Sequence, residues 1–175
     1  MKPLASILLF FPTMVLCMNT MVTLPDFDAI SGQGTLSYTG PNSSLPPESA
    51  TMSIISELTI GDNNDCKGLI LKTDEESIVV VAVNESKQVF ICPGGQEGCD
   101  GEPLDLVEIK ENVWKMYVPK FEITYQVEFE SDRFVYRIKR RRCLINYRHG
   151  CLIPGIGWRD KHVYEFKKIN NIDLP

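Results

Sequence analysis

A run of basic side chains is the strongest chemical signal in this sequence. Residues 137–142 read Arg-Ile-Lys-Arg-Arg-Arg. Successive side chains of an extended strand alternate between two faces, so every second basic residue shares one face. Guanidinium and ammonium groups arranged in this way bind sulfate or phosphate oxygens. The following loop adds basic and aromatic residues of the kind enriched at binding hot spots. The predicted contact residues are Arg137, Lys139, Arg141, Arg142, Arg148, Trp158 and Arg159.

This run belongs to a wider asymmetry of charge. Residues 131–175 hold eleven basic and four acidic side chains, a net charge of +7, in a chain whose total is −5. Residues 1–130 therefore carry −12. The basic face is either a solvated strand end that faces the acidic remainder, or a contact surface for an extracellular protein or a sulfated polysaccharide. A third interpretation makes the run from Arg137 to Arg142 a processing site that releases a C-terminal peptide.

Residues typical of catalysis are few. The only histidines are His149 and His162, and the chain has no nucleophile elbow, HExxH motif, phosphate-binding loop or dinucleotide fingerprint. The cysteines lack Cys-x-x-Cys spacing, which argues against a zinc site. We therefore expect a non-enzymatic protein that has no cofactor and no metal, and that binds no nucleic acid.

The first residues have the three parts of a secretory signal. Lys2 gives a positive start, residues 5–16 are almost wholly apolar, and polar sequence follows. A bilayer span needs about 20 apolar residues, so this stretch is too short to be one. We expect residues 1–20 to be removed as a signal peptide and the product to be secreted, extracellular and without a membrane span. Asn-x-Ser sequons predict glycans on Asn42 and Asn84.

Secretion changes the interpretation of the six cysteines. The first lies in the expected signal peptide, and an oxidising compartment favours pairing of the others. Local spacing predicts the disulfides Cys92–Cys99 and Cys143–Cys151, each of which closes a short loop. Cys66 is then left over. An odd cysteine predicts a disulfide-linked dimer, a buried thiol, or a signal cleavage that retains the first cysteine.

Short strands have to position all of these groups. Residues 21–50 are rich in glycine and proline and predict an irregular lead-in, with one short strand at residues 35–39. Residues 51–60 predict a strand or a short helix, and residues 77–83 a central strand that is buried on both sides. The alternating pattern of residues 122–130 and 133–139 is typical of a hairpin. Further strands are expected at residues 68–72, 88–92, 104–109, 113–118 and 162–168.

The pattern as a whole predicts an all-β fold, an antiparallel sandwich or barrel of eight to nine short strands, in one domain over residues 51–175. Its expected function is binding through the basic C-terminal third. Size and strand number are also compatible with lipocalin-type barrels, which carry small apolar ligands. The lead-in, however, has Gly32 and Gly34 without the tryptophan of the Gly-x-Trp that such barrels usually carry. A lipocalin-like carrier is therefore the first alternative, and a cleaved precursor is the second.

Overall fold

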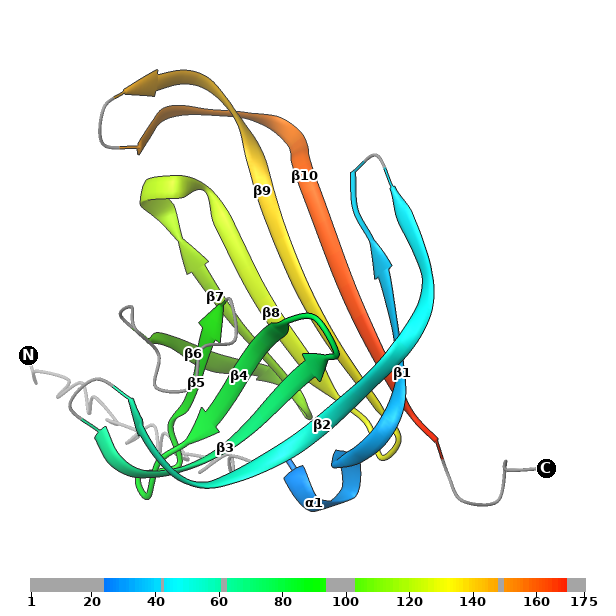
Figure 1. The fold of residues 1–175 in the computed structure, drawn as a ribbon. Helices are drawn as coiled ribbons and strands as arrows, with labels where there is room; N and C mark the ends of the chain where they lie inside the picture. The colour runs from blue at the N-terminus through cyan, green and yellow to red at the C-terminus, as the bar shows by residue number, and fades with distance from the viewer. Residues whose placement is uncertain (1–23, 42, 61–62, 94–102, 148–149, 170–175) are drawn as a thin grey trace, which may run out of the picture.

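The computed structural model of this chain describes residues 24–41, 43–60, 63–93, 103–147 and 150–169. Within them, ten antiparallel strands form a closed barrel in which each strand pairs with the next, and β1 pairs with β10 (Figure 1). The predicted all-β class is confirmed, and the strand number is slightly higher than expected. The strands are β1 (Gly32–Thr39), β2 (Ser44–Ile60), β3 (Asn63–Thr73), β4 (Ser77–Val83), β5 (Val89–Pro93), β6 (Leu104–Lys110), β7 (Val113–Val118), β8 (Ile123–Phe129), β9 (Arg133–Tyr147) and β10 (Gly150–Lys168).

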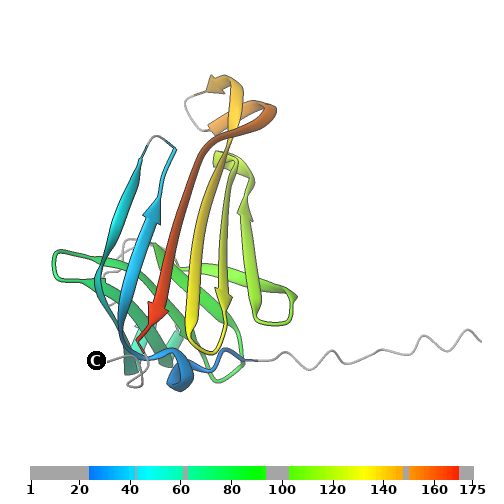
Figure 2. The same ribbon diagram turned by 90° about the vertical axis from the view of Figure 1, so that its right-hand side faces the viewer.

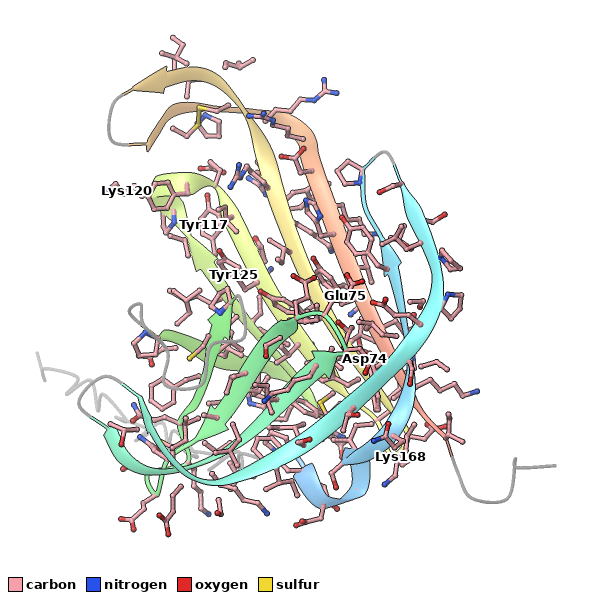
Figure 3. The ribbon with its side chains drawn as sticks, in the orientation of Figure 1. Asp74, Glu75, Tyr117, Lys120, Tyr125 and Lys168 are labelled. Carbon is pink, nitrogen blue, oxygen red and sulfur yellow. A yellow bond between two sulfur atoms is a disulfide. The ribbon has the colours of Figure 1, made fainter. Side chains whose placement is uncertain are left out.

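A short helix, α1 (Phe27–Ile30), covers one end of the barrel (Figures 1 and 2). It begins at Asp26, whose carboxylate accepts hydrogen bonds from two backbone N–H groups of the first turn. Phe27 and Ile30 are buried, and the Phe27 ring lies 6.0 Å from that of Phe129. Lys168 secures the helix from β10 by donating to the Ala29 carbonyl at 2.7 Å (Figure 3). We call this the closed end.

The segment expected to be an irregular lead-in contains β1 and the first half of β2. Glycine suits β1 because a Cβ on Gly34 would lie 2.5 Å from the Phe166 ring of β10. Pro46 and Pro47 fit into β2 where the β1 register shifts, a stretch that lacks residue-to-residue pairing with β1. A proline costs a strand no hydrogen bond at such a position. The breaker residues therefore mark irregular points in strands that do form.

Two of the predicted elements are confirmed in detail. β8 and β9 pair as the expected hairpin, with Phe129 opposite Phe134 beside the turn. β4 is buried on both sides, as its unbroken apolar sequence predicts. Val79 and Val81 face the main core, whereas Val80 joins a second apolar cluster on the outer face of the barrel. The main core therefore lies inside the barrel, and one part of the wall is covered from outside.

β9 and β10 are longer than the sequence predicts. Their hairpin extends past the neighbouring strands at the end opposite α1 (Figures 1 and 2). The last β9 residue that pairs with β8 is Arg140, and one further bond runs from the Arg141 N–H to the Glu122 carbonyl, so the hairpin beyond Arg141 has only the β9–β10 ladder. The 3-10 helix η1 (Pro119–Phe121) connects β7 to β8 at this same end. We call it the open end.

Candidate functional site

The inner wall of the barrel is layered from an apolar floor to a polar belt. The floor is a register row of four buried side chains next to α1: Phe129, Phe134, Phe166 and Leu36. One pleat further from α1, the next row crosses six strands. Its members in order are Glu108, Trp114, Val127, Tyr136, Tyr164 and Tyr38. We call the five members other than Val127 the polar belt.

The polar belt contains buried polar atoms that have no hydrogen-bond partner. They are the Glu108 Oε1, the Trp114 Nε1 and the Tyr136 hydroxyl. Trp114 and Tyr136 are each 1 % exposed. Such groups are rare in folded proteins because each forgoes its hydrogen bonds to water, so each calls for an explanation. Among the described residues only Glu122, at the β7–β8 connection, adds another such atom.

The remaining tyrosines of the belt form an aromatic cluster. The Tyr164 ring lies 4.9 Å from that of Tyr38 and 5.8 Å from that of Tyr136. The Tyr38 hydroxyl is 2.7 Å from Nδ1 of His162, which lies in the next row towards the open end. Tyr125 occupies the same row as His162, on β8 (Figure 3).

Burial sets the protonation of this cluster. It raises the pKa of Tyr136 above the ordinary tyrosine value, and the neighbouring Tyr125 and Tyr164 raise it further. Burial is also the largest cause of the raised pKa of Tyr125 and of Tyr164. These hydroxyls are therefore neutral at physiological pH, and each is able both to donate and to accept a hydrogen bond.

Sequence reasoning missed the polar belt as a site. Alternation does place Tyr136 on the apolar face of the β8–β9 hairpin. A tyrosine hydroxyl on a face that is predicted to be buried is the signal that could have identified this residue. Glu108 gives no such signal, since β6 has a weak alternation. Only the pairing of β6 with β7 puts Glu108 beside Trp114.

The predicted basic contact residues are only partly brought together. Lys139 and Arg141 both lie over the ring of Trp158, with their charged groups 5.8 Å and 5.4 Å from its centroid. Arg137 instead forms an ion pair with Glu128 at 2.6 Å, and Arg159 one with its neighbour Asp160 at 3.5 Å.

The other predicted contacts lie beyond this group. Arg142 is exposed further along the β9–β10 hairpin, where its Cβ is near Gly155. Arg148 lies outside the described residues. The processing hypothesis concerns the same strand: the run from Arg137 to Arg142 is part of β9 and pairs with β10, so cleavage there requires the barrel wall to open.

No family model matches this chain, no curated protein matches it, and no solved structure matches it. Function is therefore inferred from the geometry of the barrel. The described residues contain no helix that is long and apolar enough to cross a membrane. They also contain no group of three or more side chains suited to hold a metal ion.

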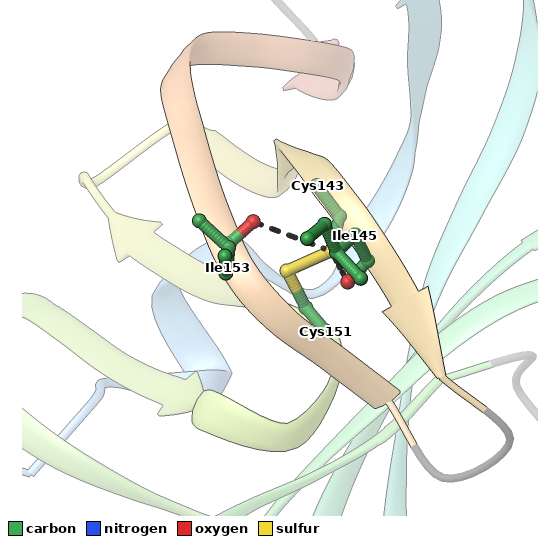
Figure 4. The surroundings of a disulfide bond; sticks show 4 residues. All are labelled: Cys143, Ile145, Cys151 and Ile153. Carbon is green, nitrogen blue, oxygen red and sulfur yellow. Dashed lines mark hydrogen bonds between the residues drawn. A yellow bond between two sulfur atoms is a disulfide. The ribbon is translucent and has the colours of Figure 1, made fainter.

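The disulfide Cys143–Cys151 is present and closes the end of the β9–β10 hairpin (Figure 4). Its Cα atoms are 5.6 Å apart, a usual separation for a disulfide. Cys92 is also disulfide-bonded, and its predicted partner, Cys99, lies outside the described residues. Cys66 is a thiol with none of its side chain exposed. A disulfide-linked dimer through Cys66 therefore requires part of the barrel to open.

The structure describes only one of the two predicted glycosylation sites. Asn42 lies outside the described residues. Asn84 is 9 % exposed in the β4–β5 turn, where its Nδ2 donates to the Gln88 side chain at 2.8 Å. Its Oδ1 accepts from the Gln88 backbone at 2.9 Å. A glycan on this nitrogen would have to displace the bond to Gln88, so glycosylation of Asn84 stays a prediction that the folded turn disfavours.

A separate pocket of about 360 Å³ lies between α1 and the β4–β5 turn. Three of its four charged lining residues, all except Glu85, already bind within the protein. Asp26 caps α1, and Lys67 forms an ion pair with Asp28 at 3.0 Å. This pocket therefore offers fewer unsatisfied groups to a ligand than the polar belt does.

Proposed function

We propose that this protein is a secreted, non-enzymatic binding protein whose barrel holds one small molecule with an apolar body and a hydrogen-bonding head. The observation that carries the proposal is the polar belt, in which three buried polar atoms have no partner within the protein. Donors and acceptors that are left without partners in a binding site are satisfied when the ligand arrives.

The width of the barrel supports this role. The diameter of a closed barrel grows roughly linearly with the number of strands. Barrels of eight strands are filled by side chains or hold one small ligand, and this barrel has ten. Its wall is therefore long enough to enclose a ligand in addition to the side chains of the floor.

The chemistry of the belt defines the ligand head. The Trp114 Nε1 can only donate, the Glu108 carboxylate can only accept, and the Tyr136 hydroxyl can do either. A head group that both donates and accepts, such as a hydroxyl, satisfies this set. The floor seals the side of the belt next to α1, and the next row towards the open end has the partly buried Met116, Tyr125 and Ile138, which suit an apolar body that extends towards the open end.

The test is the uptake of a fluorescent alcohol. Retinol has an apolar body and one hydroxyl, and retinoic acid has the same body with a carboxylate that the Glu108 charge repels. A Trp158→Phe background leaves Trp114 as the only tryptophan, so that energy transfer to the probe reports on the barrel interior. We expect saturable binding of one retinol per chain and weaker binding of retinoic acid.

Two substitutions connect this signal to the belt. Tyr136→Phe removes one hydrogen bond of about 1 kcal/mol, which corresponds to about fivefold weaker retinol binding. Tyr117→Phe makes the same chemical change on a tyrosine that is 42 % exposed at the open end, and it leaves binding unchanged. Absence of uptake, together with a native mass spectrum of the secreted protein that contains no co-purified small molecule, would refute the carrier function.

A further inference from the structure

Within the described part of the chain, a group of cations on the outer face of the barrel forms no ion pair with an acidic residue. Lys139 and Lys161 are directly opposite each other on β9 and β10. Side chains in such pairs have Cβ atoms about 4.5–5.5 Å apart, and like charges there destabilise the sheet. Arg141 follows on the same face of β9, beside the ring of Trp158. We call Lys115, Lys139, Arg141 and Lys161 the cation patch.

Strand pairing places Lys115 of β7 in the same patch: it lies opposite Gln126 of β8, which in turn lies opposite Arg137 of β9. Burial lowers the pKa of Lys139, and the charges of Lys161, Arg137 and Lys115 lower it further. These three residues come from separate strands of the wall. The sequence run alone does not reveal this convergence, because Lys115 is far from Lys139 along the chain.

Three acidic residues around the cation patch already form ion pairs with other cations. Glu128 binds Arg137, Glu165 binds Arg133 at 2.7 Å, and Asp160 lies by Arg159. Glu122 lies beside Arg141, whose backbone N–H donates to its carbonyl at 2.9 Å, but its carboxylate is buried and accepts a hydrogen bond from the Tyr117 hydroxyl. Among the described residues, no ion pair neutralises any member of the patch.

We propose that the cation patch is a second binding site, independent of the barrel interior, and that it binds a sulfated polysaccharide. Repeated sulfates along a flexible polymer can meet cations that are spread over several strands. Protein–protein interfaces instead have an apolar core with a polar rim. Two patch cations already cover the ring of the exposed Trp158. The other large exposed apolar side chains beside the patch, Val107 and Tyr117, lie at its β6–β7 edge and not at its centre.

The net negative charge of the whole chain means that a polyanion can bind only at a local positive surface. The net charge of −5 repels a polyanion, so general attraction cannot explain binding. Retention on a sulfated polymer must then come from a local positive surface. The binding must also weaken as salt rises, because exposed charges are screened beyond about 8–10 Å at physiological ionic strength.

The experiment measures binding of the full secreted protein to immobilised heparin in a salt gradient. The test variant is Lys139→Gln/Lys161→Gln, which removes the directly opposed pair. The matched control is Lys87→Gln/Lys110→Gln, which removes two exposed lysines near the closed end. At physiological ionic strength we expect about tenfold or greater loss of affinity in the test variant and little change in the control.

Desulfated heparin and polyglutamate distinguish the kind of partner. Much weaker binding to both supports recognition of sulfate. Equal binding to either one would overturn the proposal, and polyglutamate would then indicate an acidic protein surface. Equal retention of the test and wild-type proteins, or an equal loss in the control, would also overturn it. Retinol uptake is measured on the same variants, so failure of this proposal is separable from failure of the carrier function.

Discussion

Replacing Tyr136 with phenylalanine removes a single oxygen from the interior of the barrel. The side chain is 1 % exposed and its hydroxyl has no hydrogen-bond partner, whereas its ring packs against Tyr164. Phenylalanine keeps the ring and its packing. A buried polar group without a partner costs about 1–3 kcal/mol. We therefore expect Tyr136→Phe to increase the free energy of unfolding of the ligand-free protein by about 1–2 kcal/mol.

Thermal and urea denaturation of the ligand-free protein measure this gain. For a domain of this length 1 kcal/mol changes Tm by about 2–4 °C, so we expect Tm to rise by about 3–6 °C. Tyr117→Phe is the contrasting variant, since its ring is 42 % exposed and its hydroxyl has a hydrogen-bond partner, Glu122. Because it removes a hydrogen bond instead of an unpartnered group, it should lower Tm by about 1–4 °C, opposite in sign to Tyr136→Phe.

The reasoning fails if Tyr136→Phe lowers the Tm. That result would mean that the hydroxyl has a partner in the folded protein, such as a water molecule, and that the belt is satisfied before any ligand arrives. If the variant is more stable and also binds retinol less tightly, the hydroxyl is retained for binding at the expense of stability. Opposite effects on stability and on function are typical of residues in binding sites.

Three further predictions concern the rest of the fold. Because burial raises the folded-state pKa of Tyr136, the unfolded chain ionises this hydroxyl before the folded protein does. The free energy of unfolding is therefore unaffected by its ionisation below the ordinary tyrosine pKa and falls as the pH rises above about 10, and denaturation at increasing pH should show a shallower fall in Tyr136→Phe than in the wild type. Gly34→Ala forces a Cβ against a β10 ring and should cost about 1–3 kcal/mol in urea denaturation, whereas Thr35→Ala, on the exposed face, should cost well under 1 kcal/mol. Cys143→Ser/Cys151→Ser should remove about 2 kcal/mol of local stability, so that amide exchange accelerates at the end of the hairpin and protection in the barrel is unchanged. Loss of protection throughout the barrel would contradict the independence of the hairpin end.

The sequence alone determined the class of the fold and much of the barrel wall. Alternation in β8 and β9 identified the side chains that face inward, because a strand repeats every two residues and one face is buried. The unbroken apolar run of β4 predicted burial on both sides. The spacing of Cys143 and Cys151 predicted their disulfide, since a short loop keeps the two thiols close. All of these features depend on neighbours along the chain.

The tertiary structure alone decided which groups meet. β1 forms in spite of its glycines because β10 pairs with it. Residue 34 has to be glycine because the Phe166 ring occupies the space that a side chain there would need. Lys115 joins Lys139, and Glu108 joins Trp114, only through the pairing of strands. Pairing across a barrel is non-local, and it is set by the register of every ladder rather than by any one segment. For this reason the polar belt and the complete cation patch become visible only when the barrel is closed.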